Sequence, residues 1–388
     1  MTASQPGARG PLAGVRVLEI AGIGPGPFAA MLLSDLGADV VRVDRVGHVP
    51  ARGANLQPEK DVLSRGRRSI GVDLKSPAGV EVVLRLVERA DVLVEGFRPG
   101  VAERLGLGPH VCLDRNTRLV YGRMTGWGQT GPLAARAGHD LNYVAVAGAL
   151  HPIGPGDRPP AVPLNYIGDF GGGGMLLAFG VACALFERST SGRGQVVDAA
   201  MIDGAAIQTA MFHGMLAMGT WTTEREANLL DGGAPFYRCY RCADGGFVAV
   251  GALEPQFYAE LLARLELEPD EWPQHDRERW PDQSRRLAGI FAGRTRDEWA
   301  RVFEGSDACF APVLSLEEAP AHPHVEGRET FVTVEGVTQP APAPRFSRTP
   351  GGVKGPPVLH GQHTDAVLAE ARFTDAEVAA LRDAGAVA

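Results

Sequence analysis

Asp169 is the only charged residue in the stretch LNYIGDFGGGGMLLAFG, which runs from Leu164 to Gly180, and four glycines follow it almost at once. A carboxylate just before an apolar helical run is most often a helix N-cap. Glycines weaken a first helical turn, which makes sense where another group must approach the backbone closely. A second interpretation is therefore that free N–H groups at this helix start hold a thioester oxygen as it becomes an enolate, while Asp169 exchanges the proton on the neighbouring carbon.

His139 is the histidine whose setting best suits proton transfer. It precedes Asp140 in the glycine-flanked, partly polar loop ARAGHDLNY. An imidazole takes up or releases a proton near neutral pH without extreme tuning, so it can act as a general acid or base. A structural histidine in a loop remains the alternative.

Basic residues gather after the second of the predicted strands. In a chain of net charge −8, arginines near the ends of parallel strands suit a phosphate-bearing ligand, and the three phosphates of coenzyme A fit such a site. A solvated surface charge run is the alternative. The residues concerned are Arg45, Arg65, Arg67, Arg68, Lys75, Arg98 and Arg104.

Two other motifs predict structure rather than chemistry. GIGPGP, at Gly22–Pro27, follows a strand and opens a helix, but Pro27 replaces the third glycine of a dinucleotide fingerprint, which favours a tight turn. Cys239 and Cys242 have metal-ligand spacing without a second pair, so we expect structural thiols and no metal site. An odd, sparse set of five cysteines and an N-terminus without an apolar signal segment predict a cytoplasmic protein.

Alternating strands and helices dominate the first half of the chain and predict an α/β fold with a parallel sheet covered on both faces. The negative net charge argues against a nucleic-acid partner. We expect the apolar segment Gly171–Phe186 to be a buried helix rather than a membrane span. Around Phe236 the pattern changes to a hairpin with its turn at Asp244–Gly246, followed by helices, which predicts a second, smaller α+β domain. The four predicted strands occupy Val15–Ala21, Asp39–Asp44, Asp91–Phe97 and Arg118–Gly128.

Nearly the whole chain, from about Leu12 to Ser347, resembles the family III CoA-transferases, also called the CaiB/BaiF superfamily, and most closely their α-methylacyl-CoA racemase branch. The matching motifs are long and collinear. They read AGIGPGP, SDLGADVVRVDR, DLKSPAG, RPGVAERLGLGP, RMTGWGQTGP, AGHDLNY, IGDFGGGGM, GRGQVVDAAMIDG, NLLDGGAPFY and GALEPQFY.

The resemblance implies an interlocked homodimer with a Rossmann-like large domain and a small α+β domain. The large domain would comprise residues 1–199 and 340–388, and the small domain residues 237–325. Residues 200–236 and 326–339 would be the outgoing and returning linkers. The active site would lie where the large domain of one subunit meets the small domain of the other.

The resemblance also assigns roles to residues. His139 and Asp169 match the catalytic pair of the racemases, and Glu254 matches a glutamate that supports the histidine from the partner subunit. Arg45 matches a residue beside the CoA adenine. No separate cofactor is implied, because coenzyme A is part of the substrate. The remaining predicted CoA contacts are Val72, Asp73, Leu74, Lys75, Gly96, Phe97, Arg98, Arg104, Gly138, Asp140, Leu141, Asn142 and Tyr143.

The expected reaction is racemisation of a 2-methylacyl-CoA by 1,1-proton transfer. The family's transferases instead use the matching aspartate as a covalent nucleophile and generally lack a histidine like His139, so the pair favours the racemase. A non-catalytic CoA-binding regulator on the same fold is the third alternative. Two departures from the family pattern stand out: the long stretch after Arg45, and Glu226 at a position where glycine is expected.

Overall fold

The structure is a computed structural model that describes residues 10–47 and 57–388. Within these ranges the chain forms two compact units. The sheet unit comprises the chain up to Ala147, Leu164–Gln208 and Arg328–Ala388, and the second unit comprises Gly148–Pro163 and Thr209–Gly327. Most of the stretch after Arg45 that departs from the family pattern lies outside the described residues. The domain and linker boundaries expected from the sequence stay predictions.

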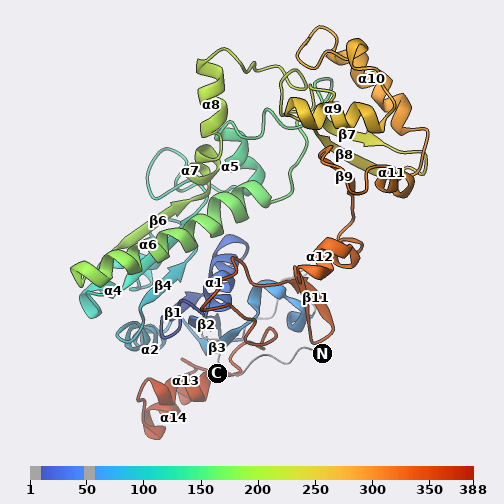
Figure 1. Cartoon of the computed structure of the whole chain (residues 1–388). Coiled ribbons are helices and arrows are strands. Elements are labelled where there is room, and N and C mark those ends of the chain that lie inside the picture. The colour runs from blue at the N-terminus through green and yellow to red at the C-terminus, as the bar shows by residue number, and fades with distance from the viewer. Residues whose placement is uncertain (1–9, 48–56) are drawn as a thin grey trace. The chain divides into compact units, whose positions relative to one another are not determined.

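The sheet unit is built on a six-stranded parallel sheet in the order β3-β2-β1-β4-β5-β6, so the mixed α/β fold with a parallel sheet is confirmed (Figure 1). Strand order reverses between β1 and β4, which leaves a crevice at the carboxyl edge of the sheet. The strands are β1 (Arg16–Ile20), β2 (Asp39–Arg45), β3 (Arg67–Val72), β4 (Val92–Glu95), β5 (Val120–Thr125) and β6 (Val196–Ala200).

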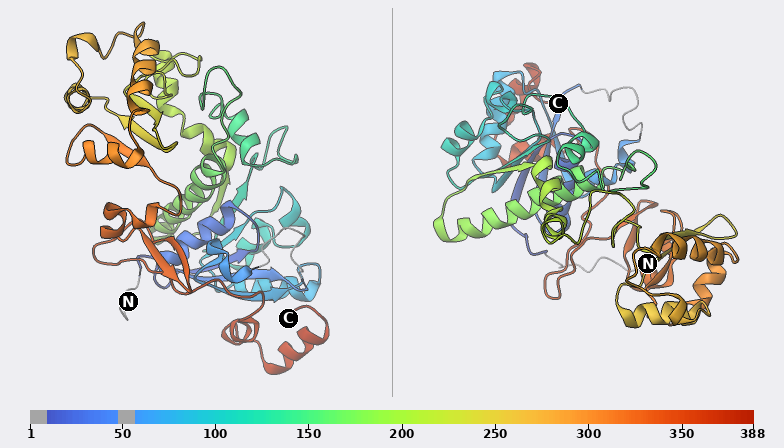
Figure 2. Two further views of the ribbon diagram at one scale, coloured as in Figure 1. Left: turned by 90° about the vertical axis from the view of Figure 1, so that its right-hand side faces the viewer. Right: turned by 90° about the horizontal axis from the view of Figure 1, so that it is seen from above.

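Helices cover both faces of this sheet because alternate strand residues point apolar side chains to opposite sides. On one face α1 (Pro25–Asp35) and α6 (Leu176–Ser191) pack over Val17, Val40 and Val94, among others. On the other face α2, α4 and α13 pack over Leu18, Ile70 and Leu93. These helices are α2 (Pro77–Val87), α4 (Pro109–Arg115) and α13 (Thr364–Glu370). A last helix, α14 (Asp375–Asp383), lies close to the C-terminus (Figure 2).

Two strands of the sheet were missed by the sequence interpretation. β3 was taken only as part of a basic cluster, because Arg67 and Arg68 interrupt its apolar pattern. Arg67 is nevertheless buried, with 3% of its surface exposed, because its guanidinium pairs with Glu19 of β1 at 2.6 Å. β6 was missed because its first residues are exposed and Asp198 interrupts it.

The second unit contains a three-stranded antiparallel sheet that confirms the predicted hairpin around Asp244–Gly246. Its strands are β7 (Tyr237–Arg241), β8 (Phe247–Gly251) and β9 (Phe310–Val313). An aromatic core that includes Phe236, Trp272 and Phe291 packs α9, α10 and α11 onto this sheet, whereas α8 and α12 contribute no residue to that core. The helices are α8 (Ala210–Ala217), α9 (Pro255–Arg264), α10 (Trp280–Phe291), α11 (Arg296–Val302) and α12 (Pro323–Gly327).

Glu226 occupies its unexpected position by making side-chain interactions that glycine lacks. Its φ of +58° is in the left-handed region, which explains why glycine is expected there. The carboxylate pairs with Arg238 at 2.7 Å and accepts a hydrogen bond from the Gly156 main-chain N–H at 3.2 Å. These two contacts offset the backbone strain within the second unit.

The segment Tyr166–Met175 (η3) is a ten-residue π-helix that continues directly into α6. Its glycines permit main-chain packing against α7 (Met201–Ile207) and α1 that no larger residue allows. A Cβ on Gly172 would lie 2.7 Å from the Ala205 nitrogen, and one on Gly174 would lie 2.6 Å from the Pro25 oxygen. The glycines therefore serve close packing, which corrects the expectation that their backbone is kept free for a ligand.

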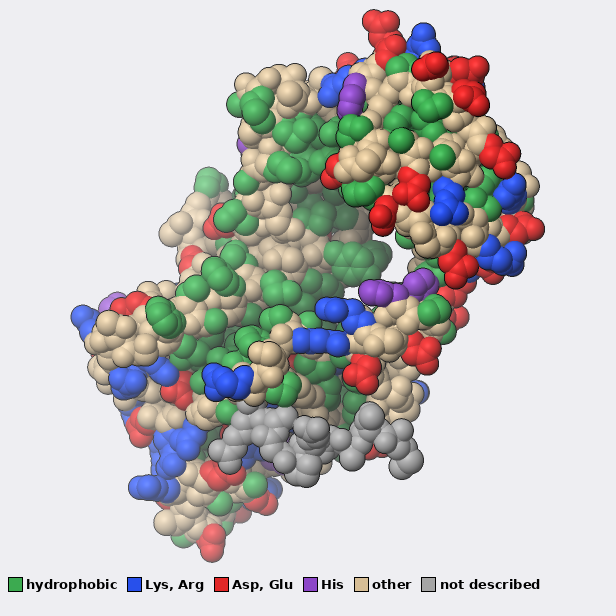
Figure 3. All heavy atoms as spheres, viewed as in Figure 1, with side chains coloured by type: hydrophobic (Ala, Val, Ile, Leu, Met, Phe, Trp, Pro, Cys, Tyr) green, Lys and Arg blue, Asp and Glu red, His purple; other side chains and the backbone are tan. Residues whose placement is uncertain are grey.

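The expected helix between Gly171 and Phe186 is confirmed, but in the single chain only one of its faces is buried, through residues such as Leu177 and Val181. Only 33% of the most apolar window of the continuous helix Tyr166–Ser191 is buried. By length and composition alone, this helix of 26 residues, with a mean hydropathy of 1.6, is apolar enough to cross a membrane. Met175, Phe179 and Phe186 share one exposed face. Figure 3 shows the apolar side chains spread over the surface along this helix.

The closest contact in this packing gives a direct test. A Cβ at Gly204 of α7 would lie 1.8 Å from the Gly172 oxygen, so Gly204→Ala forces the π-helix away from α7. Overpacking of this kind costs about 1–3 kcal/mol or more. We expect chemical denaturation to show a loss of that size in the free energy of unfolding.

Gly289→Ala in α10 is the matched control, because nothing lies within 4 Å of a Cβ at that position and alanine favours a helix. Equal stability of the two alanine variants would contradict the packing account.

Candidate active site

A cavity of about 680 Å³ opens at the carboxyl edge of the sheet unit and contains both predicted acid–base residues. Ligands of open parallel sheets bind in this position, beside the reversal in strand order. The cavity is lined by Ile20–Pro27, Leu63, Val94, Gly96–Pro99, Met124–Trp127, Ala134, Arg136–His139, Tyr143, Asn165, Asp169, Phe170 and Met201.

Asp169 is held in the cavity wall from three sides. Its main-chain N–H donates to Asp140 Oδ2 at 2.6 Å, and Asn165 Nδ2 donates to Asp169 Oδ2 at 3.1 Å. A Cβ on Gly24, whose φ is +70°, would lie 3.2 Å from the same Oδ2, so the GIGPGP turn brings bare backbone against the carboxylate. Asp169 therefore lies within a π-helix rather than at an N-cap, which corrects the first interpretation of this stretch. Its own N–H is already used by Asp140 and is not free for a thioester oxygen, while its expected role in proton exchange stays a prediction.

The surroundings of Asp169 favour its protonated form. Burial raises the pKa of Asp169 above its ordinary value, and the charge of Asp140 raises it further. The hydrogen bond from Asn165 and the charge of His139 act in the opposite direction and only partly offset the desolvation. A carboxyl group with a raised pKa can both donate and accept a proton at a pH closer to neutrality.

His139 precedes α5 (Asp140–Val146), and the residues around it fix its main chain. Its N–H donates to Asn142 Oδ1 at 3.0 Å, and the Tyr143 hydroxyl donates to the Gly138 carbonyl. The Tyr143 ring packs so closely on Gly126 and Gly138 that a Cβ at either would overlap it, at 2.0 and 2.7 Å from ring carbons. These contacts hold the backbone of His139 while leaving its imidazole exposed.

The predicted CoA contacts divide into two groups. Gly96, Phe97, Arg98, Gly138 and Tyr143 line the cavity. The others lie near the carboxyl ends of β2 and β3 or on short helices. Arg45 ends β2, Val72 ends β3 and is followed by Asp73, Leu74 and Lys75, Arg104 ends α3 (Val101–Arg104), and Asp140, Leu141 and Asn142 form the first turn of α5. Their role in CoA binding stays a prediction.

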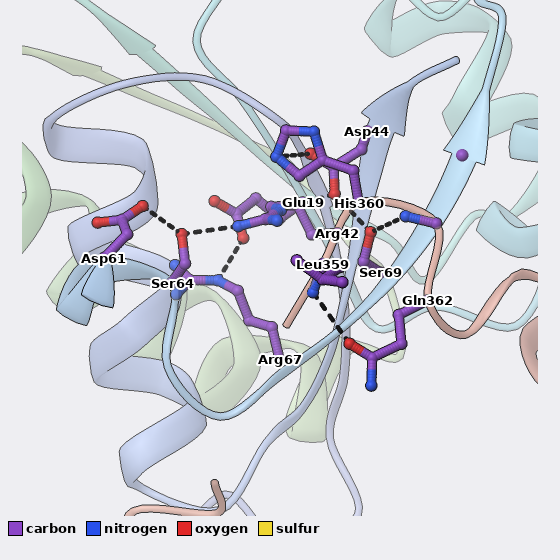
Figure 4. A network of polar contacts seen from close by, with 12 residues as sticks. Glu19, Arg42, Asp44, Asp61, Ser64, Arg67, Ser69, Leu359, His360 and Gln362 are labelled. Atoms are coloured by element: carbon purple, nitrogen blue, oxygen red, sulfur yellow. Dashed lines mark hydrogen bonds and ion pairs between the residues drawn. The ribbon is translucent and has the colours of Figure 1, made fainter. Parts of the chain in front are cut away.

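Three of the arginines proposed as phosphate ligands are engaged in ion pairs. Arg65 pairs with Asp35 at 2.5 Å, and Arg68 pairs with Asp39 at 2.7 Å. Arg67, shown in Figure 4, pairs with Glu19 and donates to the main-chain carbonyls of Pro27 and Leu63, which both line the cavity. The guanidinium groups of these arginines pair with carboxylates of the protein itself. Arg67 stabilises the cavity wall through its bonds to Pro27 and Leu63 instead of facing a ligand.

Glu254 lies in the second unit, in the exposed position that immediately precedes α9. The structure therefore brings His139 and Asp169 together in the sheet unit, and Glu254 belongs to the other unit. Its predicted role toward His139 stays a prediction.

A cavity with one histidine and one aspartate at the carboxyl edge of this parallel sheet agrees with the class of fold expected from the motifs. Residues 12–364 match the family model for CoA-transferase family III, and the chain belongs to that family. It is 48% identical to the alpha-methylacyl-CoA racemase of Mus musculus and 44% identical to that of Homo sapiens, in each case over 95% of both chains. A crystal structure of a CAIB/BAIF family protein from Brucella suis superposes with a TM-score of 0.79 at 27% identity, covering 94% of this chain and all of that one.

Sequence reasoning missed the side chains that support Asp169 and the loop of His139. Asn165 and the carboxylate of Asp140 contact Asp169, and Trp127 packs edge-on against Tyr143 with ring centroids 4.8 Å apart. Asn165 precedes Asp169 by four residues, a spacing that brings side chains together on a helix and was the available signal. No local signal linked Asp140 to Asp169, which is 29 residues away.

The raised pKa of Asp169 predicts how stability depends on pH. The folded protein binds this proton more tightly than the unfolded chain, so ionised Asp169 destabilises the fold at neutral pH. That penalty disappears as the pH falls below the ordinary aspartate pKa of 3.8. We expect Asp169→Asn to raise the Tm at neutral pH and to leave it unchanged in acid, as measured by calorimetry. A variant that is less stable than the parent at neutral pH would contradict this account.

Proposed function

We propose that this protein is an α-methylacyl-CoA racemase, which interconverts the (2R) and (2S) forms of 2-methylacyl-CoA thioesters. The observation that carries the proposal is the placement of His139 and Asp169 in the wall of one cavity. The similarity to two mammalian racemases over 95% of the chain supports it. A CoA-transferase would use Asp169 as a nucleophile and would not require the imidazole, so the presence of His139 favours the racemase.

In the proposed mechanism the two groups face opposite sides of the α-carbon. One removes the α-proton and leaves a planar enolate, and the other returns a proton to the opposite face. The thioester assists because its α-proton is more acidic than that of an ester or a carboxylate. The raised pKa of Asp169 suits it to donate the proton when one enantiomer is converted and to accept it when the other enantiomer is converted. No metal or redox cofactor takes part in this proposal, and coenzyme A enters as part of the substrate.

Remote binding of the CoA tail would position the reacting carbon. We assign this to the predicted CoA contacts, of which Arg98 lines the same cavity as the catalytic pair. The strand order of the sheet supports the description of this unit as Rossmann-like. The five free cysteines support a reducing, cytoplasmic location.

Self-association is part of the proposal. Met175, Phe179 and Phe186, which are 51%, 66% and 78% exposed, form an apolar stripe along the helix that carries Asp169. Such a stripe is costly in water and suits burial against a second copy of the chain. In the proposed interlocked homodimer, Glu254 of one subunit would support His139 of the other.

One-sided exchange tests the assignment of the two bases. His139→Ala keeps only the aspartate, so we expect it to exchange the α-proton of one enantiomer with heavy water without inverting it. Asp169→Asn should show the same behaviour with the other enantiomer. Loss of one acid–base group lowers racemisation by about 100- to 10,000-fold. The measurement is proton NMR of each pure enantiomer of a 2-methylacyl-CoA, and normal racemisation by His139→Ala would reject the assignment.

Mixed dimers test the shared site. Chains with Glu254→Ala and chains with Asp169→Asn are inactive alone in this account, but a mixed dimer retains one site with both groups intact. We expect activity to return to about a quarter of the parental rate per site when equal amounts exchange subunits randomly. Verified subunit exchange without any gain in activity would argue that each site belongs to one chain.

A further inference from the structure

Arg136 lies in the loop between Gly131 and His139, three residues before the catalytic histidine. It lines the same cavity as His139 and Asp169. Two turns shape this loop: the Ala134 N–H donates to the Gly131 carbonyl at 3.2 Å, and the Arg136 N–H donates to the Leu133 carbonyl at 2.8 Å. The hydroxyl of Tyr143 fixes the end of the loop at Gly138. These turns fix the main chain of Arg136 beside the cavity, and its side chain is exposed.

The guanidinium of Arg136 is available to a ligand. It makes no ion pair, hydrogen bond or ring contact with any other residue in the described parts of the chain. This contrasts with Arg65 and Arg67, which are buried in ion pairs with Asp35 and Glu19. An unpaired guanidinium beside a cavity is a strong site for an oxyanion, because it offers a planar fork of donors.

The charges around the cavity limit the kind of ligand. Among the described residues that line it, Arg98 and Arg136 are the only arginines or lysines. Most of the other lining side chains are apolar or glycine, and Asp169 adds a negative charge. Two guanidinium groups from separate segments suit a ligand with more than one negative charge, such as a diphosphate, rather than a single carboxylate.

We propose that Arg136 is a further substrate-binding residue, which pairs with a phosphate of the CoA tail and shares that charge with Arg98. This inference rests on the proposed function, since it takes an acyl-CoA as the substrate. The acyl chain then faces the apolar part of the cavity, and the charge of Arg136 offsets the desolvation of the phosphates as the thioester reaches His139 and Asp169.

The test compares two thioesters of the same 2-methylacyl group, one with coenzyme A and one with pantetheine, which carries no phosphate. For Arg136→Ala we expect the KM of α-deuterium exchange to rise about tenfold or more with the CoA thioester. The kcat, and the KM for the pantetheine thioester, should stay near the parental values. Arg136→Lys should recover part of the loss, because it keeps the charge but not the fork.

Arg89→Ala is the matched control. Arg89 is exposed and lines a different cavity, beside Arg16 and Asp39 at the amino ends of β1 and β2. It should leave both KM values unchanged. An equal rise of KM for both thioesters in Arg136→Ala would place the guanidinium on the acyl or pantetheine portion and overturn the proposal. An unchanged KM for the CoA thioester would overturn it as well.

Calorimetric titration with coenzyme A itself separates this inference from the proposed reaction. If the parent protein binds coenzyme A without catalysing exchange, the racemase proposal fails, while weaker binding by Arg136→Ala still supports the phosphate contact. If Arg136→Ala binds coenzyme A as tightly as the parent does, the inference fails whatever the reaction is.

Discussion

The approach of two helical backbones to a distance that only glycine permits determines where the Asp169 carboxylate lies. Gly172 and Gly204 meet with main-chain atoms in direct contact, and Gly174 packs in the same way against the start of α1. The π-helical winding of Tyr166–Met175 places Asp169 on the cavity side of this contact. Because these contacts are between backbone atoms, the position of Asp169 depends little on side-chain rotamers.

The same arrangement sets the proton affinity of the carboxylate. Asp169 is anchored through its own N–H by another carboxylate, Asp140, and this anchor brings a second negative charge toward the site. Burial and that charge together raise the pKa and favour the protonated acid, and a single hydrogen bond from Asn165 only partly opposes them. In the proposed reaction Asp169 both releases and accepts a proton, and this balance suits that role. The contact with Asp140 therefore both anchors the main chain of Asp169 and helps to raise the pKa of its carboxyl group.

Much of the parallel sheet and of the candidate site could be predicted from the sequence. Apolar periodicity located four strands of the sheet, and specific motifs identified His139 and Asp169. β3 was missed because Arg67 is buried by a long-range ion pair with Glu19, which no local pattern reveals. Asp169 was read as an N-cap because a glycine run after an acid resembles a helix start, whereas the glycines serve contacts with residues about 30 positions later and 150 positions earlier. Local rules fail where the determining partner is distant in the chain.

Deuterium incorporation by the unmodified protein tests the central claim most directly. A single enantiomer of a 2-methylacyl-CoA is incubated with the protein in heavy water and followed by proton NMR together with chiral analysis of the acyl group. The account predicts loss of the α-proton signal accompanied by inversion until both enantiomers are equally populated. Transfer of CoA to an added carboxylate, with the α-proton and its configuration retained, would contradict the account and favour a CoA-transferase.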